Sequence, residues 1–132
     1  YVLIDCPPIL GVMMVNALAA SDRILIPVQT EFLAMKGLER MVRTLAIMQK
    51  SRSREFKVTI VPTMYDKRTR ASLQTLNQLK KDYPDKVRTS AVPSDTKFRD
   101  ASLQRPPASH FADGSRGLFA YKLLLHLSLS VV

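Results

Sequence analysis

The sequence has little of what disulfide-rich, zinc-binding or membrane proteins are built from. Its 132 residues include one cysteine, Cys6, and two histidines. One cysteine excludes an internal disulfide framework and a cysteine-rich zinc site, fits a reducing cytoplasm, and leaves too few ligands for a dedicated metal cage. No run approaches the roughly 20 apolar residues that span a bilayer, and the first residues lack the pattern of a signal peptide.

Acidic residues are also few. The chain carries 20 Lys and Arg against 11 Asp and Glu, a formal net charge of +9. Such an excess favours polyanionic partners or an acidic protein surface, although solvated surface cations would give the same total. With 46% hydrophobic residues the chain can form a packed core, and we expect a single domain over residues 1–132. Because the chain starts at Tyr1, without Met, directly inside a strand pattern, we expect it to be part of a longer protein.

Short apolar runs alternate with helical patterns along the chain. Runs that end at proline or polar residues predict strands at residues 2–4, 24–28, 58–61 and 87–92. Apolar residues at helical spacing predict helices at 10–20, 34–50, 72–83 and 116–127. In the last of these the stripe is Phe119, Leu123 and Leu127. Alternating strands and helices form parallel βαβ units with helices on both faces, so the predicted fold class is α/β.

Ligands of open parallel sheets bind beyond the carboxyl ends of the strands, and Asp5 follows the first apolar run. A carboxylate at the tip of a buried strand is typical of a Walker B acid, which holds Mg²⁺ or its water. An aspartate that caps the next helix gives the same pattern, as does a rigid turn for the two prolines that follow. A Cys–His nucleophile is a weak alternative, because Cys6 and His110 have no partners at catalytic spacing.

Four segments, in order, resemble the ParA/Soj family of partition ATPases, which are relatives of MinD. The first is Val2 to Leu45, which begins VLIDCPPILG and continues through ILIPVQT. The others are TMYDKRT and its following helix in Thr63 to Val87, VPSDTKFRDAS in Val92 to Ser102, and ADGSRGLFAY in Ala112 to Tyr121. The resemblance covers almost the whole chain and implies a P-loop NTPase-like fold.

The resemblance also implies a function, an ATP-dependent dimerisation switch. In this family ATP and Mg²⁺ are held between the two subunits of a homodimer, and the ATP form binds double-stranded DNA without sequence preference. A ParB-like partner stimulates hydrolysis, and the cycle segregates or positions a plasmid, a chromosome region or a protein cluster. We therefore expect a bacterial, cytoplasmic, nucleoid-associated protein, and we do not expect a membrane partner.

Residue by residue, the resemblance assigns three sets of sites. Asp5 matches the Walker B acid, which contacts Mg²⁺ through water, and the switch segment that senses the γ-phosphate includes Cys6, Pro7, Pro8 and Leu10. The segment that approaches the adenine base matches Pro93, Ser94 and Asp95. The non-specific DNA contacts match Arg68 and Lys97, with Arg70 and Arg99 as neighbours; Lys97 and Arg99 are expected in a loop. Solvated cations remain the alternative for this last set. Arg40, Arg43, Lys50, Arg52 and Arg54 are expected to form a separate, solvated basic area.

The chain departs from the family pattern in three places. The Gly-rich phosphate loop expected ahead of Asp5 is absent from these residues, whose four glycines are scattered. Without its backbone N–H groups and lysine, we expect this chain alone to hydrolyse ATP negligibly. The loop from Arg105 to Gly117 lacks the family's Gly-Lys-Pro glycine. The apolar tail from Leu123 to Val132 could be a frameshifted tail, a docking helix or a membrane-surface segment. Two further functions stay open: a truncated, non-catalytic binding module and a MinD-like membrane-associated switch.

Overall fold

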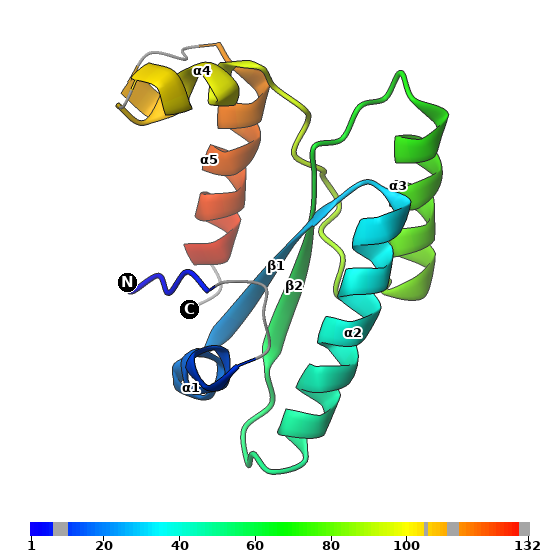
Figure 1. Ribbon diagram of the computed structural model, residues 1–132, viewed down its shortest axis with the longest axis vertical. Helices are drawn as coiled ribbons and strands as arrows, with labels where there is room; N and C mark the ends of the chain where they lie inside the picture. Colours follow the sequence, from blue (N-terminus) through cyan, green and yellow to red (C-terminus); the bar gives the residue numbers. More distant parts are fainter. Residues whose placement is uncertain (7–10, 105, 111–113, 130–132) are drawn as a thin grey trace.

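The computed structural model describes residues 1–6, 11–104, 106–110 and 114–129. The elements, in order, are α1 (Val12–Ala20), β1 (Arg23–Gln29), α2 (Phe32–Gln49), β2 (Lys57–Thr63), α3 (Arg70–Asp82), α4 (Lys97–Gln104), a 3-10 turn (Ala108–His110) and α5 (Arg116–Leu129) (Figure 1). β1 and β2 are parallel, in register from Arg23 opposite Lys57 to Gln29 opposite Thr63, and α2 is the crossover between them. The predicted α/β class, with a parallel sheet and flanking helices, is confirmed.

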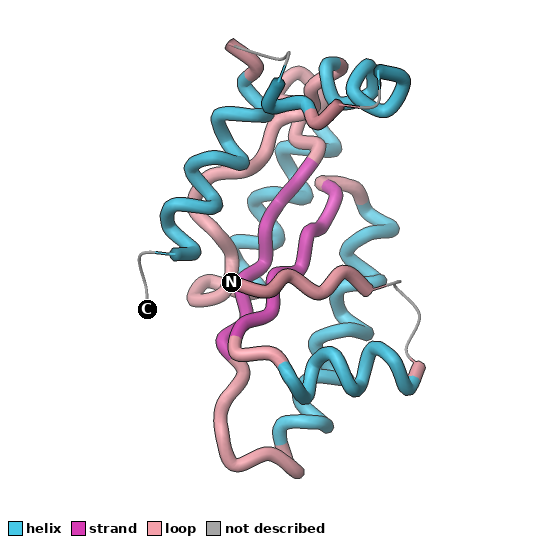
Figure 2. The backbone as a smooth tube through the Cα atoms, turned by 90° about the vertical axis from the view of Figure 1, so that its left-hand side faces the viewer, coloured by secondary structure: helices cyan, strands magenta, loops and turns pink. Residues whose placement is uncertain are grey.

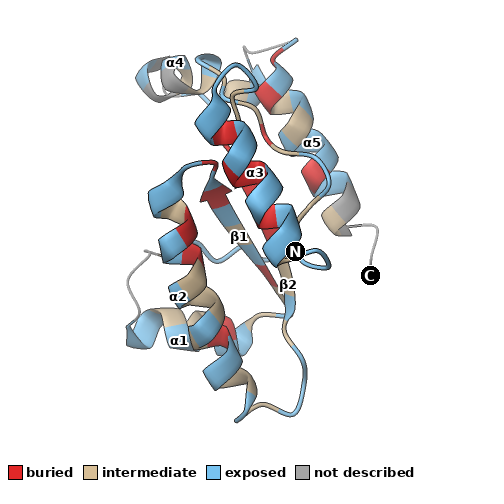
Figure 3. Ribbon diagram, turned by 90° about the vertical axis from the view of Figure 1, so that its right-hand side faces the viewer, coloured by how far each residue is buried: buried red, intermediate tan, exposed pale blue. Residues whose placement is uncertain are grey.

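Helices cover both faces of the two-stranded sheet (Figures 1 and 2). α2 and α3 lie on one side, whereas α4 and α5 lie on the other. The first side holds the main core, and Figure 3 shows the buried residues of α2 and α3 on the surfaces turned toward the strands. The residues of this cluster are Val28, Met35, Leu38, Ile60 and Leu79. A second cluster, between α1, β1 and α2, consists of Leu18, Ile24 and Leu45. On the opposite side Val61, Val92 and Leu124 form a smaller cluster.

The strand predicted at 87–92 is only partly formed. The segment follows the second edge of β2 and makes two isolated parallel bridges, Ile60 with Val87 and Tyr65 with Pro93. At one end Ile60 donates its N–H to Lys86 O at 2.8 Å, and at the other Val92 donates to Pro62 O at 2.8 Å. Regular pairing is interrupted between these points, because Pro62 has no N–H to donate to a neighbouring strand.

The strand predicted at 2–4 is wrong. In the structure residues 1–6 are irregular, and the side chains of Val2 and Leu3 are 87% and 88% exposed. Within the described part of the chain the sheet consists of β1 and β2 alone. A short apolar run becomes a strand only when a neighbour accepts its backbone hydrogen bonds, and this run finds none there. Figures 1 and 2 show the segment crossing beside the lower half of the sheet.

The last helix is present, but Phe119 and Leu123 of its predicted apolar stripe are exposed, and the side chain of Leu127 lies outside the described part. Leu124 is buried against Val61, with Ala120 beside it, whereas Phe119 is 69% exposed. The helix is apolar on several faces, so a spacing of four residues fits more than one stripe. A second correction concerns Lys97 and Arg99, which lie in α4 and not in a loop. No helix in the described residues is long and apolar enough to cross a membrane.

Part of the basic area expected to be solvated is structural. Arg52 donates from Nη1 to Leu18 O and from Nη2 to Ser21 O, both at 3.0 Å. Its guanidinium also lies 4.4 Å from the centre of the Phe56 ring. A cation that satisfies the last carbonyl groups of a helix complements the helix dipole. Arg52 therefore fixes the end of α1 to the turn between α2 and β2.

Candidate functional site

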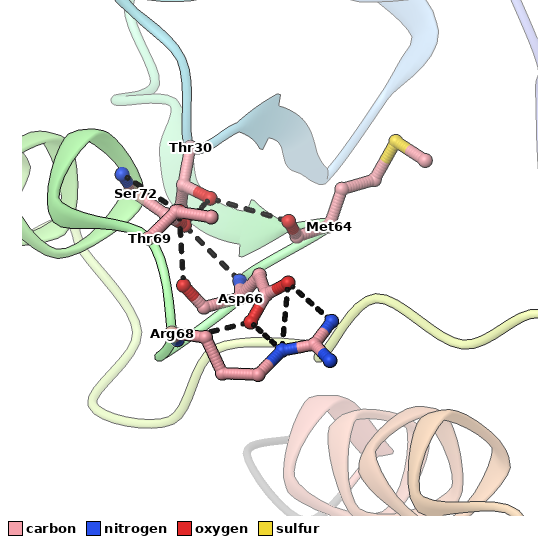
Figure 4. A network of polar contacts seen from close by, with 6 residues as sticks. All are labelled: Thr30, Met64, Asp66, Arg68, Thr69 and Ser72. Carbon is pink, nitrogen blue, oxygen red and sulfur yellow. Dashed lines mark hydrogen bonds and ion pairs between the residues drawn. The ribbon is translucent and has the colours of Figure 1, made fainter.

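A buried hydroxyl pair joins the carboxyl ends of β1 and β2 to α3 (Figure 4). Thr30 follows β1, and its Oγ1 lies 2.5 Å from Ser72 Oγ in the first turn of α3. Thr30 also donates its backbone N–H to Thr63 O at 3.1 Å. Its hydroxyl lies 3.4 Å from the carbonyl oxygen of Met64. Since both hydroxyls are buried, these bonds satisfy groups that would otherwise be costly to bury.

The loop between β2 and α3 is tightly closed on itself. Met64, the first residue after β2, has a φ of 50°, in the left-handed region that side chains rarely adopt. Thr69 is the N-cap of α3, and its Oγ1 accepts from Ser72 N–H at 3.4 Å. The Thr69 hydroxyl and N–H also lie 3.1 Å from Asp66 O. Asp66 in turn donates its N–H to Ser72 Oγ at 3.1 Å, which ties the loop to the buried pair.

The Asp66 carboxylate holds the Arg68 guanidinium by one side (Figure 4). Arg68 donates from Nη2 to Oδ2 at 2.8 Å, from Nε to Oδ1 at 3.0 Å and from its backbone N–H to Oδ1 at 3.0 Å. These bonds hold the pKa of Asp66 at about 2, the Arg68 side chain making the largest contribution and the charge of Arg116 a smaller one. The carboxylate side chain is 26% exposed and the arginine side chain 84% exposed. The Asp66 carboxylate is thus partly buried, and the Arg68 guanidinium that it binds is exposed to solvent.

The β2–α3 loop and the starts of α3 and α4 bring the predicted DNA-contact residues to one end of the molecule, where α5 also starts (Figure 1). Arg70 is the exposed first residue of α3, and Lys97 is the exposed first residue of α4. Arg99 lies in α4, and its side chain is outside the described part. Arg116, the exposed first residue of α5, is close enough to lower the pKa of Asp66 and was not singled out from the sequence.

The Asp95 carboxylate, predicted to lie near adenine, joins the starts of α4 and α5. Its Oδ2 accepts from Ser115 Oγ at 2.6 Å and from Gly117 N–H at 3.1 Å, and its Oδ1 accepts from Lys97 N–H at 3.1 Å. The Ser115 hydroxyl, followed by the Gly117 and Lys97 N–H groups, lowers the pKa of Asp95. Both oxygens are engaged in capping, so the structure gives Asp95 a clear structural role beside its predicted one.

The other two residues of the predicted adenine segment lie next to the end of β2. Pro93 bridges to Tyr65, and Ser94 donates its N–H to Tyr65 O at 2.9 Å. Ser94 is exposed and Pro93 is half-buried. Their positions, beyond the carboxyl end of a parallel strand, are those where ligands of such sheets bind. Their role toward a nucleotide stays a prediction.

Asp5 lies in the irregular segment at residues 1–6, and its side chain is exposed. With Ile4 and Cys6 it lines a cavity of ≈ 520 Å³ bounded by β1, α1 and α2. Pro7, Pro8 and Leu10 of the predicted switch segment lie outside the described residues. The described residues contain no group of three or more His, Cys, Asp or Glu side chains that could hold a metal ion on its own.

Sequence reasoning missed the hydroxyl groups that organise this end of the molecule. Thr30 and Ser72 are 42 residues apart, and Asp95 and Ser115 are 20 apart. No local pattern links residues at such separations. The Thr69 cap, in contrast, carries a usable signal, because a threonine directly before a helical apolar pattern is a common N-cap.

Comparison with known proteins identifies relatives of the chain. Residues 1–58 match the AAA_31 family, described as an AAA domain. Over 122 residues the chain is 35% identical to the sporulation initiation inhibitor protein Soj of Bacillus subtilis, covering 92% of the chain and 48% of Soj. It is 37% identical over 102 residues to the chromosome partitioning protein ParA of Caulobacter vibrioides, covering 76% of the chain and 38% of ParA.

A solved structure extends the likeness to the fold. Cobyrinic acid a,c-diamide synthase from Mycobacterium smegmatis, with bound ADP and magnesium, superposes with a TM-score of 0.60 at 32% identity, covering 76% of this chain and 45% of that one. This match supports a partial P-loop NTPase-like fold. The chain spans about half the length, or less, of the relatives it matches. It belongs to the ParA/Soj family.

Proposed function

We propose that this chain supplies the DNA-contacting end and the magnesium-side acid of a ParA-type ATPase that positions DNA or other cargo. The observation that carries the proposal is the gathering of cations at the carboxyl-end side of the sheet. We call this set the cation edge; its members are Lys67, Arg68, Arg70, Lys97 and Arg116. They come from three separate segments, yet lie at one end of the molecule (Figure 1).

The cation edge suits a phosphate backbone better than a base sequence. Lysine and arginine bind phosphates through charge and hydrogen bonds that carry no sequence information. Binding of this kind releases counterions, so each neutralised phosphate adds about one unit to the slope of log affinity against log salt. The proposed ligand is therefore double-stranded DNA of any sequence.

The DNA proposal is tested by removing single cations in the full polypeptide, with ATP and Mg²⁺ present. We expect Arg68→Ala and Lys97→Ala each to weaken binding to unrelated duplexes about equally and to lower the salt slope by roughly one unit. Lys50→Ala is the matched control, because Lys50 is an exposed cation at the C-cap of α2, outside the cation edge. Equal losses in the control, or a loss for one sequence only, would contradict the proposal.

By family resemblance we propose Asp5 as the magnesium-side acid, although the strand expected before it is not formed in the described residues. Its carboxylate is the hard oxygen ligand that Mg²⁺ prefers, and Mg²⁺ commonly takes one or two carboxylates together with waters and substrate phosphates. When bound, the ion would neutralise charge on the nucleotide phosphates. Two related structures carry ADP or an ATP analogue with magnesium, which supports these cofactors. In the full polypeptide, Asp5→Ala should reduce ATP hydrolysis more than ATP binding; unchanged turnover would reject the role.

The remaining parts of the proposed cycle come from the family. They are a homodimer formed with ATP, stimulation by a ParB-like protein, and a cytoplasmic location over the nucleoid. The alternative is a non-catalytic binding module that docks on full-length partners. An ATPase assay on the chain alone, expected to show negligible turnover, and on the full polypeptide separates the two. Turnover in neither would favour the module.

A further inference from the structure

The Asp66–Arg68 pair uses only one side of the guanidinium. Arginine has two edges that can donate two parallel hydrogen bonds, one through Nε and Nη2 and the other through Nη1 and Nη2. Asp66 accepts from Nε and Nη2. The other edge, formed by Nη1 and Nη2, makes no hydrogen bond with the described residues and is exposed to solvent.

The acid in this pair is held far more firmly than the cation. Its backbone N–H is bonded to Ser72 Oγ, and its carbonyl oxygen accepts from Thr69. Ser72 is itself fixed by the buried contact with Thr30. Arg68 is 84% exposed and has no described side-chain partner other than Asp66. The loop therefore fixes the position of Asp66, and the Asp66 carboxylate in turn fixes the position of the Arg68 guanidinium.

Capping of α3 does not account for Asp66. Thr69 is the N-cap of that helix, with its own oxygen on the Ser72 N–H. The Asp66 carboxylate oxygens instead accept hydrogen bonds from Arg68, one from its backbone N–H and three from its side chain. Exposed ion pairs of this kind add little to stability. An acid beside a proposed phosphate contact also lowers the positive potential there, so its presence calls for a compensating role.

We infer that Asp66 is a positioning residue for Arg68: it holds the Nε–Nη2 edge so that the Nη1–Nη2 edge faces outward as a ready two-point donor for a DNA phosphate. This inference rests on the proposed DNA binding. A planar guanidinium matches phosphate geometry with two parallel bonds, which a lysine ammonium cannot do. Restricting the long side chain in advance removes an ordering cost that would otherwise oppose binding.

Asp66→Asn tests the inference with little change in the loop, because an asparagine oxygen can still accept from the Arg68 backbone N–H. Affinity for a short fluorescent duplex of unrelated sequence is measured by anisotropy at about 50 and 200 mM salt, using the full polypeptide with ATP and Mg²⁺. Thermal melts by circular dichroism confirm that each variant is folded. We expect roughly three- to tenfold weaker binding from the lost restraint.

Salt separates positioning from charge. Removing a negative charge should by itself strengthen DNA binding, and salt screens that gain. The deficit of Asp66→Asn should therefore be larger at the higher salt. In the Arg68→Lys background there is no planar fork to orient, so adding Asp66→Asn should leave the affinity unchanged or raise it. A purely structural role of Asp66 would weaken binding equally in both backgrounds.

The outcomes distinguish the inference from the function on which it rests. Weaker binding by Arg68→Ala, with Asp66→Asn as tight as the unmodified protein at both salts, overturns positioning and leaves the DNA proposal standing. An equal deficit of Asp66→Asn in the arginine and lysine backgrounds also overturns it. If Arg68→Ala binds DNA as tightly as the Lys50→Ala control, Arg68 is not a DNA contact. That result rejects both the DNA-contact role of Arg68 and the positioning role of Asp66.

Discussion

Two aspartates at the same end of the molecule are used in opposite ways. Asp66 accepts hydrogen bonds from Arg68, an exposed residue two positions away, whereas Asp95 accepts hydrogen bonds from donors at the starts of α4 and α5. The first arrangement is local and faces solvent. The second joins segments that are 20 residues apart and holds them together. The role of an acid in a loop beyond a strand therefore depends on the donors around it.

The largest effect is expected at Gly117, where α5 starts beside Asp95. A Cβ there would collide with the Phe98 ring and lie 3.0 Å from the Asp95 Cβ. We expect Gly117→Ala to lower the free energy of unfolding by about 2 kcal/mol, as overpacking commonly does. Urea unfolding checks this value.

Gly37 provides the matched control for that substitution. It lies within α2, is exposed, and a Cβ there meets no atom within 4 Å. Gly37→Ala should raise the free energy of unfolding, by up to about 1 kcal/mol, through helix propensity. Similar changes at both glycines would show that α5 does not sit tightly on the Asp95 loop.

The next effect concerns Asp95 itself. Asp95→Ala leaves the Ser115 hydroxyl and the Lys97 and Gly117 N–H groups without this acceptor. Losing a helix cap commonly costs about 1–2 kcal/mol, and we expect a loss of that order in urea unfolding. Asp66→Asn should cost clearly less, because its carboxylate bonds within one exposed loop. An equal cost at the two aspartates would remove the contrast between them.

A smaller effect is expected from the hydroxyl pair that supports the Asp66 loop. Thr30→Val and Ser72→Ala each leave a buried partner unsatisfied, which costs about 1 kcal/mol or slightly more. Because the two oxygens lie 2.5 Å apart, the double variant should be more stable than the sum of the single losses predicts. A double-mutant cycle in urea measures this coupling; additive losses would contradict a direct bond.

The smallest effect is the pH dependence of the Asp66 pair. Its pKa of about 2 lies below the ordinary value of 3.8, so the pair stabilises the folded chain above pH 3.8 and loses that contribution as the pH falls toward 2. The stability difference between the unmodified chain and Asp66→Asn should therefore shrink over this window. Thermal melts across it check the sign; a difference that grows on acidification would contradict the pairing.

Much of the sheet and its two main helices could be predicted from the sequence because local pattern and burial agree there. β1, β2, α2 and α3 each lie within about two residues of their predicted ends, which is the ordinary uncertainty of element boundaries. The prediction from sequence fails where the structure of a segment depends on which distant segment packs against it. Residues 2–4 have a strand pattern without a paired neighbour, and α5 buries Leu124 in place of the predicted stripe.

The candidate site divides in the same way. Arg68 and Asp66 are two residues apart, so a turn that pairs them lies within reach of local reasoning. The contacts of Thr30 with Ser72 and of Asp95 with Ser115 depend on how distant segments pack, and no spacing rule carries that information. Arg116 became relevant only because α5 starts near the β2–α3 loop, where its charge acts on Asp66.

The outer border of β1 has a consequence for handling the protein. Among the described residues β1 pairs with β2 alone, so the opposite row of backbone groups has no strand beside it. Open rows of this kind recruit extended chains from other molecules and promote self-association. Pro27, in the middle of β1, removes one donor from the backbone and so interrupts the template. Replacing Pro27 with valine should make concentrated samples more prone to fibrillar precipitation.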